Sequence, residues 1–353
     1  MSSDILGNPM SRAAILLTTL ILLSSSIVST SVLAEGNDSR DPPTVKIGFL
    51  YDMTGPIAVY GPGFSAAADI AEDHINSMQS QYNFEIVYAD SGCDVSQAAS
   101  AAQSLVNAGV VAVAGAACSG ASMGANSVLS GDGIPQVSYA SSNYALSDDS
   151  SYPGFMRVVP SDAVQGHALS YALNQTGDTY PAIVHIDPDS RGVADTFTDA
   201  YGSSNICSTL GYDDWDHTND DDFSDEVYSL MSDGCDSVVM VSNSLDGAAL
   251  VEELRDWGFS GSIVGGFEIT YDDWLNEFDY PSEANGVYAV KQVYPGPQTN
   301  LQTAFDYECS QDSDCDSGIL VREAYDSIRI IADAYINSSS YSSLEHAILG
   351  TGT

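Results

Sequence analysis

Two periods of apolar residues alternate along this chain from residue 44 onwards. Short β-rich runs are followed by longer stretches in which apolar residues recur at helical spacing, as Ala67, Ile70 and Ala71 do. The first block predicts strands over 44–50, 83–89 and 110–114 and helices over 63–76 and 94–107. Asp94 is a good N-cap for the second of these helices. This repetition predicts a parallel sheet with helices on both faces.

The alternation pauses around 155–161 and then restarts as a second block. Its apolar segments lie at 182–186, 194–201, 206–210, 223–231, 237–241, 247–257 and 262–264. Further on, residues 319–336 have the spacing of one long helix. Two α/β blocks joined at a pause predict two lobes with a cleft between them. Ligands of such sheets bind beyond the carboxyl ends of the strands.

The first 34 residues have the composition of a secretory signal peptide. Arg12 precedes the apolar run 13–23, which is shorter than the ~20 residues that a membrane span needs. We expect cleavage after Ala34, and an uncleaved N-terminal anchor is the alternative. Residues 35–43 are polar and end in two prolines, which is typical of a linker. In both cases we expect the folded part outside the cytoplasm, either secreted into the periplasm or the medium or tethered to the membrane.

The charge of the chain restricts its partners. Lys and Arg number 9 and Asp and Glu number 49, which gives a net charge of −40. Such a surface repels phosphate backbones, so we expect no nucleic-acid partner. The acids are spread along the chain, which is typical of proteins that work in salty water.

Three motifs match functional loops but lack the required context. Residues 61–66 match G-x-G-x-x-A, but residues 51–60 separate them from the strand that a dinucleotide loop follows directly. Residues 120–124 match G-x-S-x-G around Ser122, without a recognisable triad context for any His. Residues 312–323 resemble a calcium loop, but a serine occupies the place where the sharp turn needs glycine. We therefore expect no catalytic residue, no metal and no cofactor.

Four stretches in a fixed order point to one family. They are Gly48-Phe49-Leu50 running on to Thr54–Gly61, Asp90-Ser91-Gly92-Cys93-Asp94, Gly115-Ala116-Ala117-Cys118-Ser119-Gly120, and Arg157–Asp162 followed by Gln165-Gly166. Together they resemble the leucine/isoleucine/valine-type (type I) periplasmic solute-binding proteins of ABC importers. The resemblance covers residues 44–340 and implies an α/β fold of two doubly wound parallel-sheet lobes joined by a hinge.

We expect the domain boundaries to follow this layout. The first lobe would comprise 44–160 and a return segment at 292–353, and the second lobe 161–291. The chain ends at Thr353, before the glycine-rich final strands with which the family returns to its second lobe. We therefore expect either a shortened sequence or an unusual C-terminus.

The function implied by the resemblance is capture of a small solute. The protein would be a monomer that closes its lobes on an amino acid or a related polar solute and delivers it to an ABC permease, without catalysis. A ligand-sensing receptor domain of the same fold is one alternative. A secreted hydrolase that uses Ser122 is the other.

The family pattern also implies ligand-binding positions. Ser119, Ser142 and the backbone at Ala140 would hold the carboxylate of an amino acid, since hydroxyl groups and helix N-termini are good carboxylate donors. Glu268 would accept from the ammonium group, and Tyr60 would form the aromatic wall of the side-chain pocket.

Two expected cleft positions depart from the family. Arg191 stands in a Ser-Arg-Gly stretch where the family has Tyr-Gly, and Asn243 replaces an aromatic residue. An Arg and an Asn in the cleft would suit a polar or acidic ligand better than an aliphatic one. Arg191 could equally point to solvent and pair with a nearby Asp.

Six cysteines in an oxidising compartment predict disulfides, and six allow 15 pairings. Cys93 and Cys118 follow the second and third predicted strands, which we take to be neighbours, and the family resemblance places a bridge there. The next two cysteines begin or precede two strands of the second lobe in the same way. The expected pairs are Cys93–Cys118, Cys207–Cys235 and Cys309–Cys315. None of these bridges crosses between the lobes, so closure stays free.

Overall fold

The computed structural model describes residues 41–351 except 188–189, 213–221, 271–273, 292, 294–297 and 317. The expected signal peptide at 1–34 and most of the expected linker at 35–43 lie outside the described residues. Within the described residues, no helix has both the length and the apolar character needed to cross a bilayer.

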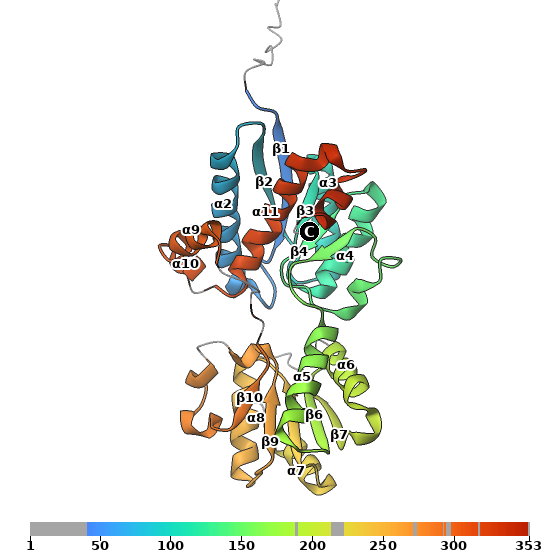
Figure 1. The fold of residues 1–353 in the computed structure, drawn as a ribbon, viewed down its shortest axis with the longest axis vertical. Coiled ribbons are helices and arrows are strands. Elements are labelled where there is room, and N and C mark those ends of the chain that lie inside the picture. Colours follow the sequence, from blue (N-terminus) through green and yellow to red (C-terminus); the bar gives the residue numbers. More distant parts are fainter. Residues whose placement is uncertain are drawn as a thin grey trace, which may run out of the picture. The chain divides into compact units, whose positions relative to one another are not determined.

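The first lobe contains a parallel sheet of five strands in the order β2-β1-β3-β4-β5 (Figure 1). The strands are β1 (Thr44–Tyr51), β2 (Asn83–Asp90), β3 (Ala112–Ala114), β4 (Gln136–Ser138) and β5 (Phe155–Arg157). The helices between them are α2 (Gly61–Met78), α3 (Val95–Ala108) and α4 (Ser119–Leu129). Ile47 of β1 pairs with Ile86 of β2 and with Ala112 of β3, which sets the register.

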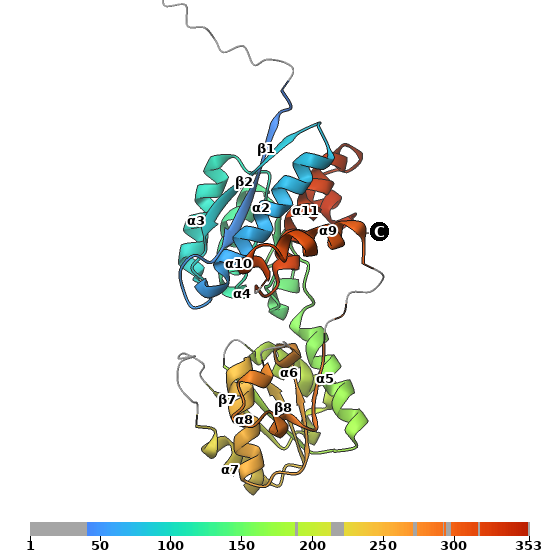
Figure 2. The same ribbon diagram turned by 90° about the vertical axis from the view of Figure 1, so that its left-hand side faces the viewer.

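Alternate residues of β1 enter the cores on the two faces of this sheet, because successive side chains of a strand point to opposite sides. Ile47 and Phe49 pack with α2, whereas Leu50 packs with α3 and α4. Figures 1 and 2 show α2 on one face and α3 on the other. The apolar residues of β1 are therefore buried on both sides, as the parallel-sheet prediction requires.

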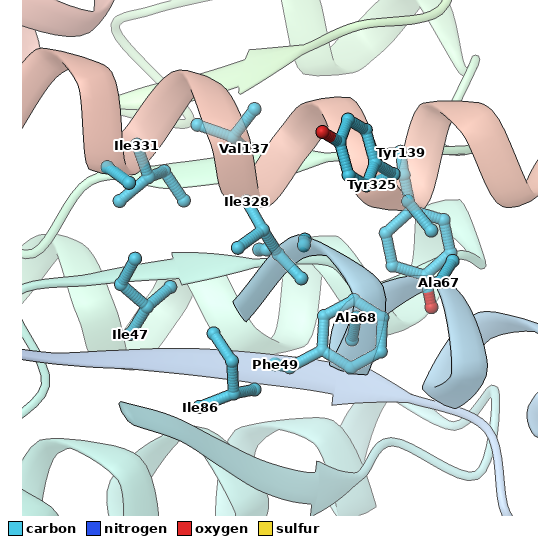
Figure 3. Close-up of a cluster of buried hydrophobic side chains, with 14 of the residues drawn as sticks. Ile47, Phe49, Ala67, Ala68, Ile86, Val137, Tyr139, Tyr325, Ile328 and Ile331 are labelled. Carbon is cyan, nitrogen blue, oxygen red and sulfur yellow. The ribbon is translucent and has the colours of Figure 1, made fainter. Parts of the chain in front are cut away.

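Helices from the C-terminal part of the chain complete the first lobe. They are α9 (Asn300–Cys309), α10 (Ser313–Asp316), α11 (Val321–Asn337) and α12 (Leu344–Leu349). Tyr325, Ile328 and Ile331 of α11 lie in one cluster with Ile47 and Phe49 (Figure 3). The first lobe is thus built from two separate stretches of sequence.

The second lobe has its own five-stranded parallel sheet, in the order β10-β9-β8-β6-β7. Its strands are β6 (Pro181–Ile186), β7 (Ser208–Tyr212), β8 (Ser237–Val241), β9 (Ser262–Gly265) and β10 (Val287–Ala289). Its helices are α5 (Asp162–Thr176), α6 (Arg191–Tyr201), α7 (Ser224–Asp233) and α8 (Ser244–Asp256). Val184 packs with α7 and α8, and the adjacent Ile183 packs with α5 and α6. Both lobes are therefore helix–sheet–helix sandwiches, which confirms the predicted fold class.

The predicted elements agree with the observed ones where a cap or a long apolar period marked them. Asp94 caps α3, and its carboxylate accepts from the backbone N–H groups of Ser96 and Gln97, both at 2.8 Å. The long C-terminal helix begins at Val321 rather than at residue 319, because Leu320 adopts a left-handed backbone with φ of 53°. The sequence pattern did not predict α4, α5, α9, α12 or the short strands β4, β5 and β10.

Candidate functional site

The ligand residues expected in the first lobe all follow strands of its sheet. Tyr60 precedes α2 in the segment after β1, Ser119 is the first residue of α4 after β3, and Ala140 and Ser142 follow β4. Because β1, β3 and β4 are consecutive in the sheet, their carboxyl ends meet at one edge. All four residues are partly buried. This edge is therefore the candidate half-site of the first lobe.

Ser119 connects the start of α4 to the loop that follows β4. Its Oγ accepts a hydrogen bond from the backbone N–H of Asn143 at 3.2 Å. The first N–H groups of a helix have no partner within the helix and carry the positive end of its dipole. An anion such as a carboxylate can therefore be held at this helix start together with the Ser119 hydroxyl group.

Buried hydroxyl groups fix the backbone of this loop. Ser138 Oγ donates to the carbonyl of Ala116 at 2.6 Å and accepts from the N–H of Ser141 at 2.9 Å. Ser141 Oγ lies 2.8 Å from Ser122 Oγ, and Ser122 is fully buried inside α4. The hydroxyl group of Ser122 is therefore part of the loop scaffold, away from solvent.

Ser142 also contacts the start of α5. Asp162, the first residue of α5, donates its N–H to the carbonyl of Ser142 at 2.9 Å, and the Ser142 side chain hydrogen-bonds the Asp162 carboxyl group. Burial raises the pKa of Asp162. Arg157 donates to the carbonyls of Ser141 at 3.3 Å and Asn143 at 2.8 Å. We did not assign roles to Arg157 and Asp162 from the sequence, although both lie in the family stretch 157–162.

Glu268 lies in the second lobe, in the 3₁₀ turn Phe267–Thr270 just after β9. Gln165 of α5 donates its side-chain N–H to Glu268 Oε2 at 3.2 Å, and Ser244 of α8 donates its hydroxyl group to the Glu268 carbonyl at 3.2 Å. Burial raises the pKa of Glu268 to about 7, the nearby Asp162 raises it further, and the bond from Gln165 opposes this. The partly buried carboxyl group of Glu268 can therefore take a cationic group, and its charge depends on pH near neutrality.

Arg191 and Asn243 already have partners in the second lobe. Arg191 is exposed at the start of α6 and pairs with the carboxylate of Asp187, with Nε 2.9 Å from Oδ1. Asn243 caps α8: its side-chain oxygen accepts from the N–H of Asp246 at 2.8 Å, and its amide N–H donates to the Asp246 carboxylate at 2.8 Å. The ion pair of Arg191 is the solvent-facing alternative that the sequence left open.

Two pockets lie near these residues. A small one is lined by Ala140 and Ser142 of the first lobe and by Ser161, Gln165 and Phe267 of the second, among others. The larger has a volume of about 720 Å³ and is lined by segments 158–168, 267–270, 290–293 and 305–323. The larger one has none of the seven expected ligand residues among its lining residues. Gln165 and Phe267 line both pockets and were missed by the sequence reasoning.

The structure contains the three expected disulfide pairs. Cys93 bonds Cys118 with Cα atoms 5.3 Å apart, Cys207 bonds Cys235 at 5.5 Å, and Cys309 bonds Cys315 at 5.0 Å.

The expectation that the bridged strands are neighbours is wrong in both lobes. In the first lobe β2 and β3 flank β1, and in the second β7 and β8 flank β6. In the first lobe the packing of α3 against α4 brings the cysteines together, since each lies next to the start of one of these helices. A Cβ at Gly124 would stand only 2.1 Å from the carbonyl of Val95, which shows how closely the two helices approach.

The other two sequence motifs serve packing in the described structure. Gly61 begins α2, and a Cβ there would stand 2.2 Å from the carbonyl oxygen of Asp52, so this glycine allows a close approach of helix and loop. In the calcium-like stretch, Asp312 accepts from the N–H groups of Asp314 and Cys315, and Ser313–Asp316 form a helical turn. Among the described residues, no group of three or more His, Cys, Asp and Glu side chains is placed to hold a metal ion.

Comparison with known proteins gives three kinds of similarity. Residues 64–346 match the family described as "Receptor family ligand binding region". The "Leu/Ile/Val-binding protein homolog 3" of Brucella melitensis is 27% identical over 252 residues, which are 70% of this chain and 67% of that protein. The "Leu/Ile/Val-binding protein" of Escherichia coli (strain K12) is 26% identical over 225 residues, 63% of this chain and 60% of that protein.

Two solved structures illustrate the similarity in fold. The branched-chain amino acid transporter substrate binding protein LivJ of Streptococcus pneumoniae, in complex with isoleucine, has a TM-score of 0.70 at 22% identity and covers 86% of this chain and 87% of its own. A solute binding protein of an ABC transporter from Rhodopseudomonas palustris HaA2, in complex with p-hydroxybenzoic acid, has a TM-score of 0.72 at 17% identity, with 87% and 84% covered. At these identities the likeness shows a shared fold.

Proposed function

This chain belongs to the receptor family ligand binding region, and from that premise we propose that it captures a free α-amino acid or a closely related polar solute between its lobes. It is a solute-binding protein of the leucine/isoleucine/valine type. The observation that carries the choice of ligand is chemical complementarity between the half-sites. The first lobe offers hydroxyl and backbone N–H donors, and the second offers a carboxyl group, as the two ends of an amino acid require.

We propose that the carboxylate of the ligand binds at the start of α4. The hydroxyl groups of Ser119 and Ser142 and the backbone at Ala140 would donate to it. The two hydroxyl-bearing loops are joined by the bond from Asn143 N–H to Ser119 Oγ at 3.2 Å, so the donors are fixed before the ligand arrives. Preorganised donors cost less to order on binding. Tyr60 would pack against the side chain of the ligand.

The ammonium group of the ligand would bind Glu268. A cation beside this carboxyl group favours its ionised form, so binding releases a proton wherever the free site is protonated. With a pKa of about 7 in the ligand-free protein, affinity should rise with pH up to neutrality. Below pH 7 it should fall by up to about tenfold per pH unit. Arg191 and Asn243 would select for polar ligand side chains at the outer part of this half-site.

We propose that the protein performs no catalysis. The hydrolase alternative needs Ser122 as an exposed nucleophile, but this side chain is fully buried and hydrogen-bonded to Ser141. A nucleophile that no substrate reaches cannot form an acyl intermediate. The names of the relatives support delivery of the solute to an ABC permease outside the cytoplasm by a monomer. A sensory receptor domain would use the same half-sites and differ in its membrane partner.

A thermal-shift screen with the twenty amino acids, their amides and urea tests the ligand class, since a ligand stabilises the folded state by RT ln(1 + [L]/Kd). Calorimetry on Glu268→Gln should then show at least about 30-fold weaker binding, since truncating one partner of a buried charge pair costs ~2–5 kcal/mol. The exposed Glu277→Gln is the matched control. Unchanged affinity in Glu268→Gln would exclude the amino-acid assignment and favour a neutral or anionic solute.

A further inference from the structure

Gln165 and Glu268 form a side-chain pair that the sequence did not single out. Gln165 lies one turn into α5, and its amide N–H reaches Glu268 Oε2 at 3.2 Å. The two residues are 103 positions apart in sequence, so only the fold of the second lobe brings them together. Gln165 also lines the small pocket beside Ala140 and Ser142. The pair therefore lies where the two half-sites approach each other.

The backbone beside this pair leaves no room for a further side-chain atom. A Cβ on Gly266 would stand 2.2 Å from Glu268 Oε2 and 2.5 Å from Gln165 Nε2. Gly266 is not among the residues with positive φ, so its backbone suits any residue and only the space requires glycine. The glycine is therefore explained by the amide–carboxylate contact, and not by a turn.

We propose that Gln165 is a positioning and specificity-determining residue, which holds Oε2 of Glu268 so that the other oxygen meets the cationic group of the ligand. This inference rests on the proposed function. A glutamine is suited to the role because it donates a hydrogen bond without adding charge. A cation at the same place would neutralise Glu268 from within and compete with the ligand.

The charged groups that face Glu268 allow a test that separates positioning from mere packing. Asp162 on α5 is the acid that acts on the Glu268 carboxyl group, and Arg157 on β5 in turn acts on Asp162. The remaining contacts of Glu268 are the bond from Gln165 and its own backbone N–H at the carboxyl group, and the Ser244 hydroxyl group at its carbonyl. Of these groups Gln165 alone is a neutral side-chain donor to the carboxyl group. Its removal should therefore shift the pH at which Glu268 ionises.

The first experiment measures binding of leucine by calorimetry from pH 5.5 to 8.5 in the wild type, Gln165→Leu and Gly266→Ala. If the screen selects an acidic amino acid, glutamate replaces leucine. Both variants should move the midpoint of the pH profile upward by about half a unit to one unit, with a larger loss of affinity at pH 6 than at pH 8. Gln175→Leu, at an exposed position of the same helix, should leave the profile unchanged. Equal loss at every pH, or no loss, would overturn the proposal.

A second variant tests specificity by supplying the cation from the protein. Gln165→Lys should weaken leucine binding at least tenfold and strengthen binding of 4-methylpentanoate, which is leucine without its amino group. For glutamate the corresponding acid is pentanedioate. Gln175→Lys should change neither affinity. If Gln165→Lys leaves the preference for the amino acid intact, then Gln165 does not set specificity.

Carbon-13 NMR of the Glu268 carboxyl group distinguishes failure of this inference from failure of the proposed function. The titration needs no ligand, so it reports on the pair even in a protein that binds no amino acid. Gln165→Leu should raise the titration midpoint of Glu268 in the ligand-free protein. An unchanged midpoint would remove the positioning role, whatever the ligand.

Discussion

The two lobes share one topology but differ in where their disulfide lies. In each sheet the bridge links the segments next to the two strands that flank the first strand of the lobe. In the first lobe Cys93 and Cys118 lie past the carboxyl ends of β2 and β3, beside Ser119. In the second lobe Cys207 and Cys235 lie before the amino ends of β7 and β8, at the opposite edge from Glu268. The same covalent device therefore supports a binding edge in one lobe and the remote edge in the other.

The difference teaches that stability and binding are linked differently in the two halves. The carboxylate half-site is built on a covalently tied helix start and a network of serine hydroxyl groups. The ammonium half-site depends on hydrogen bonds and burial around one carboxyl group. Perturbing the first half-site should therefore change folding and affinity together, whereas the second can be changed with separate effects on each.

The largest expected effect comes from removing the disulfides. Replacing both cysteines of a pair by serine should cost about 3.5 kcal/mol of unfolding free energy in either lobe, because the closed loops of 25 and 28 residues have similar chain entropy. Only the Cys93→Ser/Cys118→Ser protein should also lose ligand affinity, because Ser119 adjoins that bridge. Denaturant unfolding and calorimetry on both double variants measure this. Equal affinity in the two would break the comparison between the lobes.

An intermediate effect concerns Glu268 in the ligand-free protein. Its folded pKa of about 7 lies above its ordinary 4.5, so between these values the folded protein holds a proton that the unfolded chain has released. The unfolding free energy therefore falls as pH rises from about 4.5 to about 7. Glu268→Gln should be more stable than the wild type at pH 8 by about 1–3 kcal/mol, and equal to it near pH 4.

Thermal unfolding at both pH values tests this expectation, with Glu277→Gln as the exposed control. The same substitution should weaken ligand binding, so function and stability of this half-site would oppose each other. A variant that is less stable than the wild type at pH 8 would show that the carboxylate of Glu268 stabilises the fold, contrary to the expectation.

The smallest expected effect compares two serines at helix starts. Ser119→Ala removes the acceptor for Asn143 N–H and one donor to the ligand, so affinity should fall by about threefold to tenfold, as expected for a hydrogen bond of ~0.5–1.5 kcal/mol. Ser244→Ala removes only a bond to the Glu268 carbonyl, and affinity should change by less than twofold. Calorimetry on both variants gives the ratio. A larger loss from Ser244→Ala would place the stricter half-site in the second lobe.

The sequence predicted the fold where local signals agreed with the tertiary structure. Asp94 marks the start of α3, and the runs at 44–50 and 237–241 are buried strands. It did not predict α5, because exposed residues such as Val164 and Tyr171 blur the apolar period of that helix. It also gave no strand order, so the bridged strands were taken for neighbours.

For the site, the sequence could identify chemistry at strand ends but not the pairing of side chains. Ser119 and Glu268 were expected from the family pattern, and the structure places both just after parallel strands. The contact of Gln165 with Glu268 links two residues 103 positions apart, and no local period encodes such a contact. The ion pair of Arg191 with Asp187 is a choice between neighbours that only the fold resolves.

The remote position of the Cys207–Cys235 bridge has a consequence for how this protein can diverge. The loops at 187–191, 242–246 and 266–270 follow β6, β8 and β9 and carry no disulfide of their own. Substitutions there are free of the covalent framework, so inheritance can alter the side-chain preference of the second lobe step by step. The first lobe, with its bridged helix start, would meanwhile conserve recognition of the group that all amino acids share. One gene duplication could thus yield receptors for different nutrients from a common frame.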